Sequence, residues 1–342
     1  MKTPIPTVVS FGEVLLRLTS PKGERLASAH GLTPYYGGAE ANVCILLAQL
    51  GLATEFVTAL PQNPLGTGAI RHLRQYGVGT DAVLIEGERI GLYYHEPSDG
   101  VRSANVFYDR GGSSFSRLQT KRIPWTEIFD RADWFHWSGI SPALGPQPTT
   151  MCLEAIKAAR DLGISISVDL NYRASLWNSV HDPVIVMPDL LAGTRVMNGD
   201  LHALNQMLRI ETNVSASFEA RFEDAAKQMT DLLPDLEVLA MTFRDTTSTG
   251  QQAYRAAIYS DGECYFTKTH ILPKITDRIG SGDAFMAGLL TGIIEKRSWS
   301  HVIDFATACG VLKHSIKGDC AQFDRSDVQA YLDGGSTLLL NR

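Results

Sequence analysis

The sequence contains no apolar run near the roughly 18 residues that a membrane-spanning helix needs. Its start also lacks the apolar stretch of a signal peptide. The five cysteines are scattered, odd in number and never spaced as C-x-x-C, which predicts unpaired thiols in a reducing compartment. These absences favour a cytoplasmic protein without a membrane partner, and no residues are identified as ligands of a protein-bound metal.

Runs of lysine and arginine are absent as well, and the net charge is −6 with a pI of about 5.9. This balance argues against a nucleic-acid partner. The 342 residues are 44% hydrophobic and 20% charged, with 30 glycines, which is ordinary for a globular chain. Because neither an internal repeat nor a long linker interrupts the sequence, we expect one domain over residues 1–342.

Strand and helix patterns alternate along the chain. The run Thr7–Phe11 predicts a buried strand, and the first helical pattern places Val43, Leu46, Leu47 and Leu50 on one face. Further strands are expected at 54–59, 134–138, 164–168, 195–197, 237–242, 254–260 and 263–268, and further helices at 64–76, 149–162, 201–208, 222–233, 284–294, 299–314 and 326–332. The order predicts an α/β fold with a doubly wound sheet flanked by helices.

Two strand patterns at 90–96 and 103–108 interrupt this alternation, with a turn at 97–100 between them. Such an excursion from an α/β domain usually forms a lid or a dimer contact. We therefore expect a small β-sheet lid, with its strands within residues 13–36 and 90–115. The end of the chain, residues 334–342, is expected to be a loosely held tail.

The stretch Asp277–Phe285 is the strongest local signal. Two glycines and a serine precede Asp283, and an apolar run with small residues on one helical face follows. This pattern predicts a tight loop leading into a helix N-terminus, whose N–H groups and dipole attract phosphate. A carboxylate there repels phosphate, but it is useful if it accepts the proton of an attacking hydroxyl. The alternative is that Asp283 only caps the helix.

A second glycine pair, Gly37-Gly38, precedes Asn42 near the start of the first predicted helix. Glycines allow the backbone to approach a ligand closely, and Asn42 can hydrogen-bond a hydroxyl. A plain strand-to-helix turn is equally consistent with this segment. Polar residues at Asp169–Arg173 follow a predicted buried strand, the position at which open α/β sheets build their sites.

Together these glycine motifs resemble the signatures G-G-x-x-x-N and D-T-x-G-A-G-D of the ribokinase (PfkB) carbohydrate kinases. Within that family the chain looks most like the 2-keto-3-deoxygluconate kinases, and the resemblance spans nearly its whole length. The closer features are Gly91–Tyr93, Tyr108–Arg110, Asp169–Arg173 with Leu176-Trp177, and Lys317–Asp319.

The resemblance implies roles for individual residues. Asp283 matches the catalytic base, and Gly280, Ser281 and Gly282 match the anion hole. The implied sugar-acid contacts are Gly37, Gly38, Asn42, Tyr93, Tyr108, Arg110, Arg173 and Asp319. The implied nucleotide side consists of Asn171, Asn198, Thr242 and Arg244. Two arginines suit an acidic sugar because guanidinium groups bind carboxylates through a planar fork, although ordinary surface ion pairing is the alternative.

The chain departs from the family pattern at three places. Arg278 and Ile279 replace the usual Thr-x before the first glycine. The acid expected three residues after Asn198 is missing, and Asp200 stands one place early. After Thr242 the sequence lacks the usual glycine-rich nucleotide loop. The residues that contact adenine and position magnesium are therefore not assigned.

The expected function is ATP-dependent phosphorylation of 2-keto-3-deoxygluconate at its terminal hydroxyl, giving 2-keto-3-deoxy-6-phosphogluconate. The implied cofactors are ATP and Mg²⁺, the partners are small molecules, and self-association through the lid stays open. The alternatives are a kinase for another sugar, such as fructose, or a non-catalytic sugar sensor on the same fold. A Rossmann dehydrogenase is disfavoured because no G-x-G-x-x-G follows the first strand.

Overall fold

The computed structural model describes residues 5–99, 102–178, 181–247 and 250–334 of the chain. Its main sheet has ten strands, in the order β13-β12-β11-β10-β9-β8-β1-β4-β5, with β14 also pairing with β12. All neighbours from β11 to β5 are parallel, whereas β12 is antiparallel to β11, β13 and β14. The strands are β1 (Thr7–Phe11), β4 (Ala53–Leu60), β5 (Val83–Ile85), β8 (Trp134–Ser138), β9 (Ser165–Asp169), β10 (Thr194–Asn198), β11 (Val238–Thr246), β12 (Gln252–Ser260), β13 (Glu263–Phe266) and β14 (His270–Leu272).

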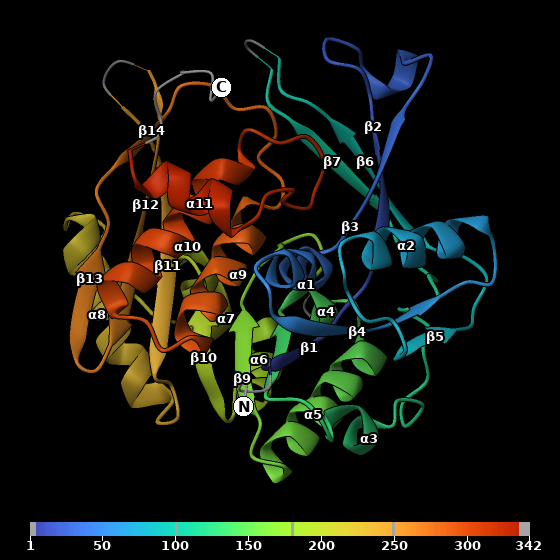
Figure 1. Ribbon diagram of the computed structural model, residues 1–342, viewed down its shortest axis with the longest axis horizontal. Coiled ribbons are helices and arrows are strands. Elements are labelled where there is room, and N and C mark those ends of the chain that lie inside the picture. The colour runs from blue at the N-terminus through green and yellow to red at the C-terminus, as the bar shows by residue number, and fades with distance from the viewer. Residues whose placement is uncertain (1–4, 100–101, 179–180, 248–249, 335–342) are drawn as a thin grey trace.

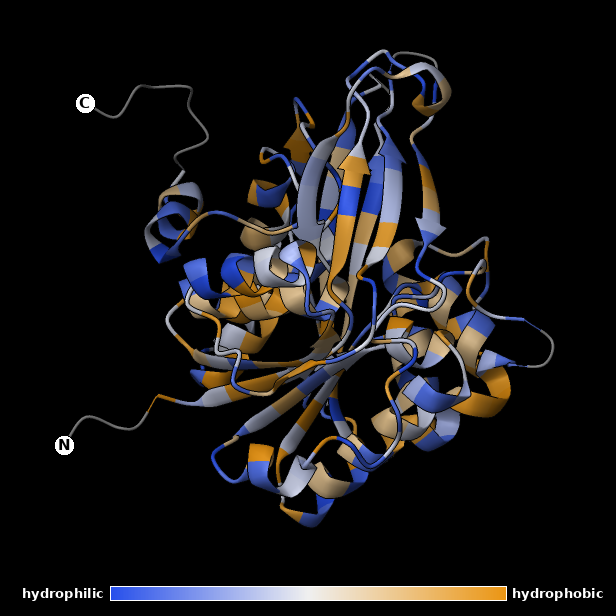
Figure 2. Ribbon diagram, turned by 90° about the vertical axis from the view of Figure 1, so that its right-hand side faces the viewer, coloured by the Kyte–Doolittle hydropathy of each residue, from blue (hydrophilic) through white to orange (hydrophobic). Residues whose placement is uncertain are grey.

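Helices cover both faces of this sheet, so the doubly wound prediction is confirmed (Figures 1 and 2). Strand β1 shows why: Val8 enters one apolar layer, whereas Val9 and Phe11 enter the other, because side chains alternate along a strand. The Val8 layer contains α1 (Ala39–Gln49), α9 (Ser281–Ile294), α10 (Trp299–Lys313) and α11 (Arg325–Leu332). The opposite layer contains α3 (Trp125–Phe129), α4 (Ile140–Ala143), α5 (Pro146–Asp161), α6 (Pro183–Leu190), α7 (Leu201–Leu208) and α8 (Phe218–Leu232).

The small residues of α9 allow α10 to pack closely against it. A Cβ atom on Gly288 would lie 2.8 Å from the Cα atom of Ala306, and one on Gly292 would lie 3.0 Å from a methyl carbon of Val302. The predicted small-residue face is therefore a helix-packing face. It anchors α9, so the N-terminus of this helix has a defined place in the fold.

A second sheet of four strands, called the small sheet below, stands over one edge of the main sheet (Figures 1 and 2). Its order is β3-β2-β6-β7, formed by β2 (Leu15–Thr19), β3 (Thr33–Gly37), β6 (Gly91–Glu96) and β7 (Asn105–Asp109). These ranges agree closely with the expected lid strands. Helix α2 (Pro64–Gln75) packs between this sheet and α1, in an apolar cluster that includes Leu16 and Ile90.

Most predicted elements are present within a few residues of their expected bounds, but short ones were missed. The missed strands are β5 and β14, and β3 was expected only as part of the broader lid range 13–36. The missed helices are α3, α4 and α6, with a 3-10 turn at Leu26–Ser28. These elements span too few residues to show a clear periodicity, and α6 has Pro188 in its interior. The expected turn at 97–100 and the tail at 334–342 lie partly outside the described residues.

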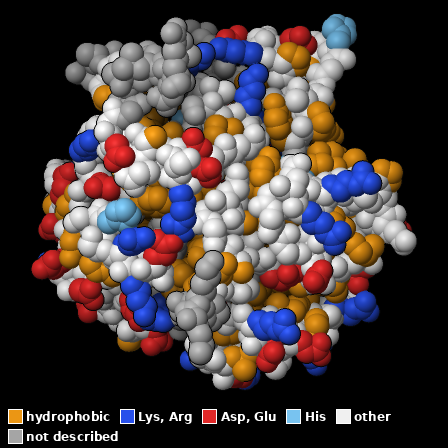
Figure 3. Space-filling view, in the orientation of Figure 1, with side chains coloured by type: hydrophobic (Ala, Val, Ile, Leu, Met, Phe, Trp, Pro, Cys, Tyr) orange, Lys and Arg blue, Asp and Glu red, His pale blue; other side chains and the backbone are white. Residues whose placement is uncertain are grey.

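Acidic and basic side chains are interspersed on the face seen in Figure 3. Within the described ranges, none of the helices combines the length and the apolar character that crossing a membrane requires.

Candidate active site

A cavity of about 410 Å³ lies where the small sheet meets the loops at the carboxyl ends of the parallel strands. This is the position at which ligands bind to open α/β sheets. The predicted residues that line it are Gly38, Asn42, Tyr93, Tyr108, Arg110, Asn171, Arg173, Asn198, Thr242, Arg244, Gly280, Ser281, Gly282, Asp283 and Asp319. The remaining predicted residue, Gly37, lies behind the cavity wall, since a Cβ atom on it would fall 2.2 Å from Oδ2 of Asp319.

The loop from Asp277 to Gly280, called the anion loop below, leads directly into α9. Gly280 is the residue before the helix and has a left-handed backbone with φ of 83°. A Cβ atom there would lie 1.8 Å from the main-chain oxygen of Asp319, so only glycine fits. The first-turn N–H groups of a helix have no partners within the helix, and here that end lines the cavity. The arrangement suits an anionic ligand.

Two arginines add positive charge beside this loop. Arg244 on β11 donates a hydrogen bond of 2.7 Å from Nη2 to Oγ of Ser281, the first residue of α9. Arg278, within the anion loop, donates from Nη2 to Oε1 of Gln252 at 3.1 Å. Both arginines line the cavity, and Arg278 was not among the predicted site residues.

Asp283 lies in the first turn of α9 and faces Asn42 in the first turn of α1. Nδ2 of Asn42 donates to Oδ2 of Asp283 at 2.7 Å. Helix α9 has no side-chain cap, so no contact in the structure supports the alternative in which Asp283 serves only as a cap. The Oδ1 atom of Asn42 is buried and has no hydrogen-bond partner among the described residues, which leaves an acceptor at the cavity wall.

The surroundings of Asp283 raise the pKa of its carboxyl group to about 7. Burial is the main cause, and the nearby carboxylates of Asp169 and Asp319 add to it. The hydrogen bond from Asn42 and the positive charge of Arg173 act in the opposite direction. A carboxyl group with this pKa exchanges its proton near neutral pH, which is what proton transfer requires.

The small sheet supplies the aromatic side of the cavity. Tyr93 on β6 and Tyr108 on β7 are directly paired, and their ring centroids are 5.8 Å apart. The Tyr93 hydroxyl donates a short hydrogen bond to Oδ2 of Asp319. The Arg110 guanidinium lies 5.6 Å from the Tyr108 ring centroid, within the range of a cation–π contact.

Arg110 and Arg173 differ in their environments. Arg110 is only 7% exposed, and its Nε atom donates to Oε2 of Glu13 at 2.8 Å. Ser113 donates a short hydrogen bond to the other oxygen of Glu13. Arg173 is exposed and donates from Nη1 to the main-chain oxygen of Tyr172 at 2.9 Å, and no ion pair of Arg173 is present among the described residues. Arg110 is therefore balanced by a carboxylate, whereas Arg173 keeps a free positive charge at the cavity.

The predicted nucleotide residues lie after β9, at the end of β10 and in the second half of β11. Asp169 accepts a hydrogen bond from the main-chain N–H of Asn171 at 3.1 Å. Burial raises the pKa of Asp169 to about 6, although a hydrogen bond with Asn198 counteracts part of this effect. The Oδ1 atom of Asn198 is buried without a hydrogen-bond partner in the described structure. Asp200 caps α7 by accepting from the Ala203 N–H at 2.7 Å, and it also lines the cavity.

Three or more metal-binding side chains do not cluster anywhere in the described part of the chain. Near the predicted nucleotide residues, the cavity nevertheless has oxygen atoms of the kind that ligate Mg²⁺, in Asp169, in Asp200 and in Asn198, whose Oδ1 atom has no hydrogen-bond partner among the described residues. Mg²⁺ commonly binds through one or two carboxylates together with phosphate oxygens and water. These residues therefore fit a magnesium ion that a nucleotide carries into the site.

Sequence reasoning missed several cavity residues. Two acidic ones, Glu13 and Glu40, lie after β1 and in α1. Asp169, at the end of β9, belongs to the polar segment Asp169–Arg173 that the sequence placed at a site, but it was given no role of its own. Glu40 is held by the hydroxyl groups of Ser138 and Ser141 at 2.7 and 2.9 Å, contacts that no sequence spacing indicates.

Comparison with known proteins agrees with this geometry. The family model described as "pfkB family carbohydrate kinase" matches residues 6–324. The 2-dehydro-3-deoxygalactonokinase of Haloferax volcanii is 27% identical over 96% of this chain and 97% of its own length. Fructokinase-1 of Oryza sativa is 28% identical over 91% of this chain and 92% of its own length.

A solved structure extends this likeness to three dimensions. The 2-dehydro-3-deoxygluconokinase of Thermotoga maritima superimposes with a TM-score of 0.91 at 34% identity, covering 96% of this chain and all of the other. The α/β fold is thus that of the pfkB kinases, a family that uses ATP. The chain belongs to the pfkB family of carbohydrate kinases.

Proposed function

We propose that the protein transfers the terminal phosphoryl group of ATP to the terminal hydroxyl of 2-keto-3-deoxygluconate. The observation that carries the proposal is that Asp283 and Arg173 line the same cavity, with no ion pair of Arg173 present among the described residues. The positive charge of Arg173 acts on Asp283 across this cavity, which supports the binding of an acidic sugar there. The names of the similar proteins include sugar-acid kinases, which supports the same substrate class.

In the proposed reaction Asp283 accepts the proton of the attacking hydroxyl. The sugar oxygen forms a bond to the terminal phosphorus, the bond from that phosphorus to the bridging oxygen breaks, and ADP leaves with the electron pair. The anion loop and Arg244 stabilise the negative charge of the group in transfer, which is the main catalytic requirement of phosphoryl transfer. A Mg²⁺ ion bound to the nucleotide would neutralise further phosphate charge. Asp169, Asp200 or Asn198 would supply its protein ligands.

Arg173 would orient the substrate by binding its carboxylate, with Tyr93 and Tyr108 against the sugar chain.

The five cysteines are all free, which supports a reducing cytoplasmic compartment. The pairing of Arg110 with Glu13 favours one alternative, a kinase for a neutral ketose, because only one of the two predicted sugar-acid arginines, Arg173, is then without an ion pair among the described residues.

ADP release in the presence of ATP and Mg²⁺ tests these possibilities directly. The panel should include 2-keto-3-deoxygluconate, 2-keto-3-deoxygalactonate, gluconate and fructose. The proposal expects the largest kcat/KM with 2-keto-3-deoxygluconate and a product phosphorylated at the terminal carbon. A clear preference for fructose would replace the proposal with the neutral-sugar alternative, and binding without turnover would indicate a sugar sensor.

A further inference from the structure

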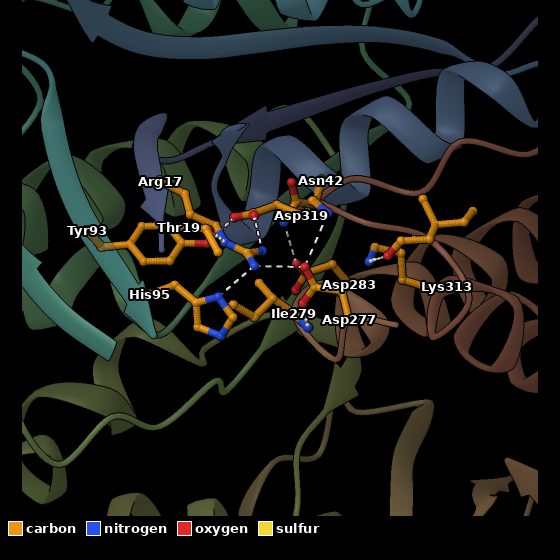
Figure 4. A network of polar contacts seen from close by, with 12 residues as sticks. Arg17, Thr19, Asn42, Tyr93, His95, Asp277, Ile279, Asp283, Lys313 and Asp319 are labelled. Atoms are coloured by element: carbon orange, nitrogen blue, oxygen red, sulfur yellow. Dashed lines mark hydrogen bonds and ion pairs between the residues drawn. The ribbon is translucent and has the colours of Figure 1, made fainter. Parts of the chain in front are cut away.

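A single buried guanidinium joins the small sheet to the anion loop. Arg17 lies on β2 and is only 2% exposed. Its Nη2 atom lies 2.8 Å from Oδ2 of Asp277, and its Nη1 atom lies 3.0 Å from Oδ1 of Asp319 (Figure 4). Asp277 begins the anion loop and Asp319 follows α10, so neither acid belongs to the small sheet. The two ends of one planar fork thus bind two carboxylates from separate segments.

The other contacts of Arg17 lie within the small sheet. Its Nε atom donates to Oγ1 of Thr19 at 2.7 Å. Its Nη2 atom also donates to Nδ1 of His95 on β6 at 2.7 Å, because a guanidinium has no acceptor atoms. The Tyr35 ring on β3 lies 5.2 Å from its central carbon. Three strands of the small sheet therefore hold the arginine in one orientation.

Both acidic residues contact the anion loop, Asp277 through its carboxylate and Asp319 through its main chain. Oδ1 of Asp277 accepts the Ile279 N–H at 3.1 Å, and Oδ2 accepts the Gly318 N–H at 3.2 Å. The main-chain oxygen of Asp319 packs against Gly280, because a Cβ atom on Gly280 would lie only 1.8 Å from this oxygen. A displacement of either acid would therefore displace the loop that faces the phosphate.

One of these acids, Asp319, also lines the cavity beside Tyr93. Asp319 accepts the hydrogen bond of the Tyr93 hydroxyl, and both residues line the cavity. Lys313 lies behind the anion loop, is fully buried and donates from Nζ to the Ile316 oxygen at 3.2 Å (Figure 4). With Arg17, it balances the charge of the two acids. The cluster thus connects the sugar-facing tyrosine with the phosphate-facing loop.

We infer that Arg17 is a positioning residue that couples the sugar end of the cavity to the anion loop. A sugar bound against Tyr93 and Asp319 restricts the position of Asp319. Because the Arg17 guanidinium binds both Asp319 and Asp277, it also restricts the position of Asp277 and the anion loop. Sugar should therefore tighten nucleotide binding, and nucleotide should tighten sugar binding by the same factor. The inference rests on the proposed kinase function but not on which sugar is the substrate.

The test measures this coupling by calorimetry. A non-hydrolysable ATP analogue with Mg²⁺ is titrated into the full chain without and with a saturating sugar, chosen as the best-phosphorylated member of a panel of sugars and sugar acids. The coupling ratio is the Kd of the analogue without sugar divided by its Kd with sugar. In the wild type we expect a coupling ratio of about 5 to 150, the usual range of coupling between sites. Arg17→Lys keeps the charge but cannot bind both acids through a planar fork, so the coupling ratio should fall toward one.

Arg25→Lys is the matched control. Arg25 also approaches a carboxylate of the small sheet, Glu96, but at 3.6 Å and with its side chain 61% exposed, so the variant should keep the wild-type ratio. Each single ligand should still bind Arg17→Lys within a few-fold of the wild type. If that variant does not fold, Tyr93→Phe removes only the hydroxyl link to Asp319 and should also lower the ratio.

Two results would overturn the inference. The first is a wild-type ratio near one, and the second is a wild-type ratio retained in the folded Arg17→Lys or Tyr93→Phe variant. Failure of 2-keto-3-deoxygluconate as a substrate would instead count against the proposed function. The coupling would then be measured with the sugar that is phosphorylated, so the two failures remain distinguishable.

Discussion

At the residue scale, Asp283 and Arg173 are the two groups that decide what the site can do. Asp283 has a pKa near neutrality because its carboxyl group is poorly solvated and lies near other carboxylates, and it has one hydrogen-bond donor in Asn42. Arg173 is an exposed cation at the same cavity, as are Arg244 and Arg278. The sequence motif predicted the position of Asp283 at a helix N-terminus, but the burial that raises its pKa depends on residues far away in the chain.

Asp283→Asn should separate chemistry from structure. Asparagine is similar in size and can still accept the hydrogen bond from Asn42, but it cannot take a proton. We expect kcat to fall by roughly 10²–10⁴, the usual contribution of a general base. Asp189→Asn, on an exposed position of α6, is the control and should keep full activity. A near-normal rate in the Asp283 variant would remove this residue from the proposed mechanism.

The pH dependence of kcat/KM provides an independent measurement. The carboxyl group must be deprotonated to accept a proton, and its pKa is raised to about 7. Activity should therefore rise with pH and level off above about pH 7, falling as much as tenfold per pH unit on the acidic side. The profile should be recorded for the free enzyme at low sugar concentration. A rate constant that is flat from about pH 5.5 to 8.5 would contradict proton transfer to Asp283.

Arg173→Lys tests the recognition of a carboxylate. Lysine keeps the charge but loses the planar fork, so we expect a loss of roughly 1.5–3 kcal/mol, or about ten- to a hundred-fold in kcat/KM, on sugar acids. Activity on fructose should change little. Arg195→Lys is the control, because Arg195 pairs with Glu237 outside the cavity lining. Equal losses on acidic and neutral sugars would show that Arg173 does not read a carboxylate.

At the scale of elements, the site depends on two helix N-termini held together by packing. Helices α1 and α9 lie in one apolar layer, and the contact between Asn42 and Asp283 joins their first turns. Periodicity predicted both helices and the buried face of α1, because such patterns are local. It did not predict the pairing of Arg110 with Glu13, since β7 and the start of β2 are brought together only by the small sheet.

Gly280→Ala and Gly282→Ala form a matched pair of variants at the start of α9. A methyl group on Gly280 would lie 1.8 Å from a main-chain oxygen and would require a left-handed backbone, whereas one on Gly282 would meet no atom within 4 Å. Gly280→Ala should lose roughly 1–3 kcal/mol of unfolding free energy or more, with a large loss of activity. Gly282→Ala should keep the wild-type unfolding free energy in urea titrations. Equal stability of the two variants would show that the anion loop is not constrained by Asp319.

At the scale of the whole molecule, the cavity is built by two sheets that sequence reasoning could only place approximately. The alternation of strands and helices predicted the main sheet, and the strand pair near residues 90–108 predicted a separate small sheet. The link between them through Arg17 was not predictable, because Asp277 and Asp319 are more than two hundred residues away in the sequence. Local patterns indicate elements, whereas buried charge pairs are set by tertiary structure.

The raised pKa of Asp283 should also make the free energy of unfolding depend on pH. The pKa of Asp283 is raised from its ordinary value of 3.8 to about 7, so the folded protein keeps this proton over a range in which the unfolded chain has released it. Because the folded state then binds more protons, Asp283 lowers the free energy of unfolding progressively from about pH 4 to about pH 7. Asp283→Asn removes this cost. The variant should gain stability relative to the wild type across that window, by at most about 1.4 kcal/mol per pH unit, and the gain should level off above pH 7. Urea unfolding of both proteins at pH 5 and pH 8 measures the difference. A variant less stable than the wild type at both pH values would mean that the Asp283 carboxylate is favourably held in the folded state.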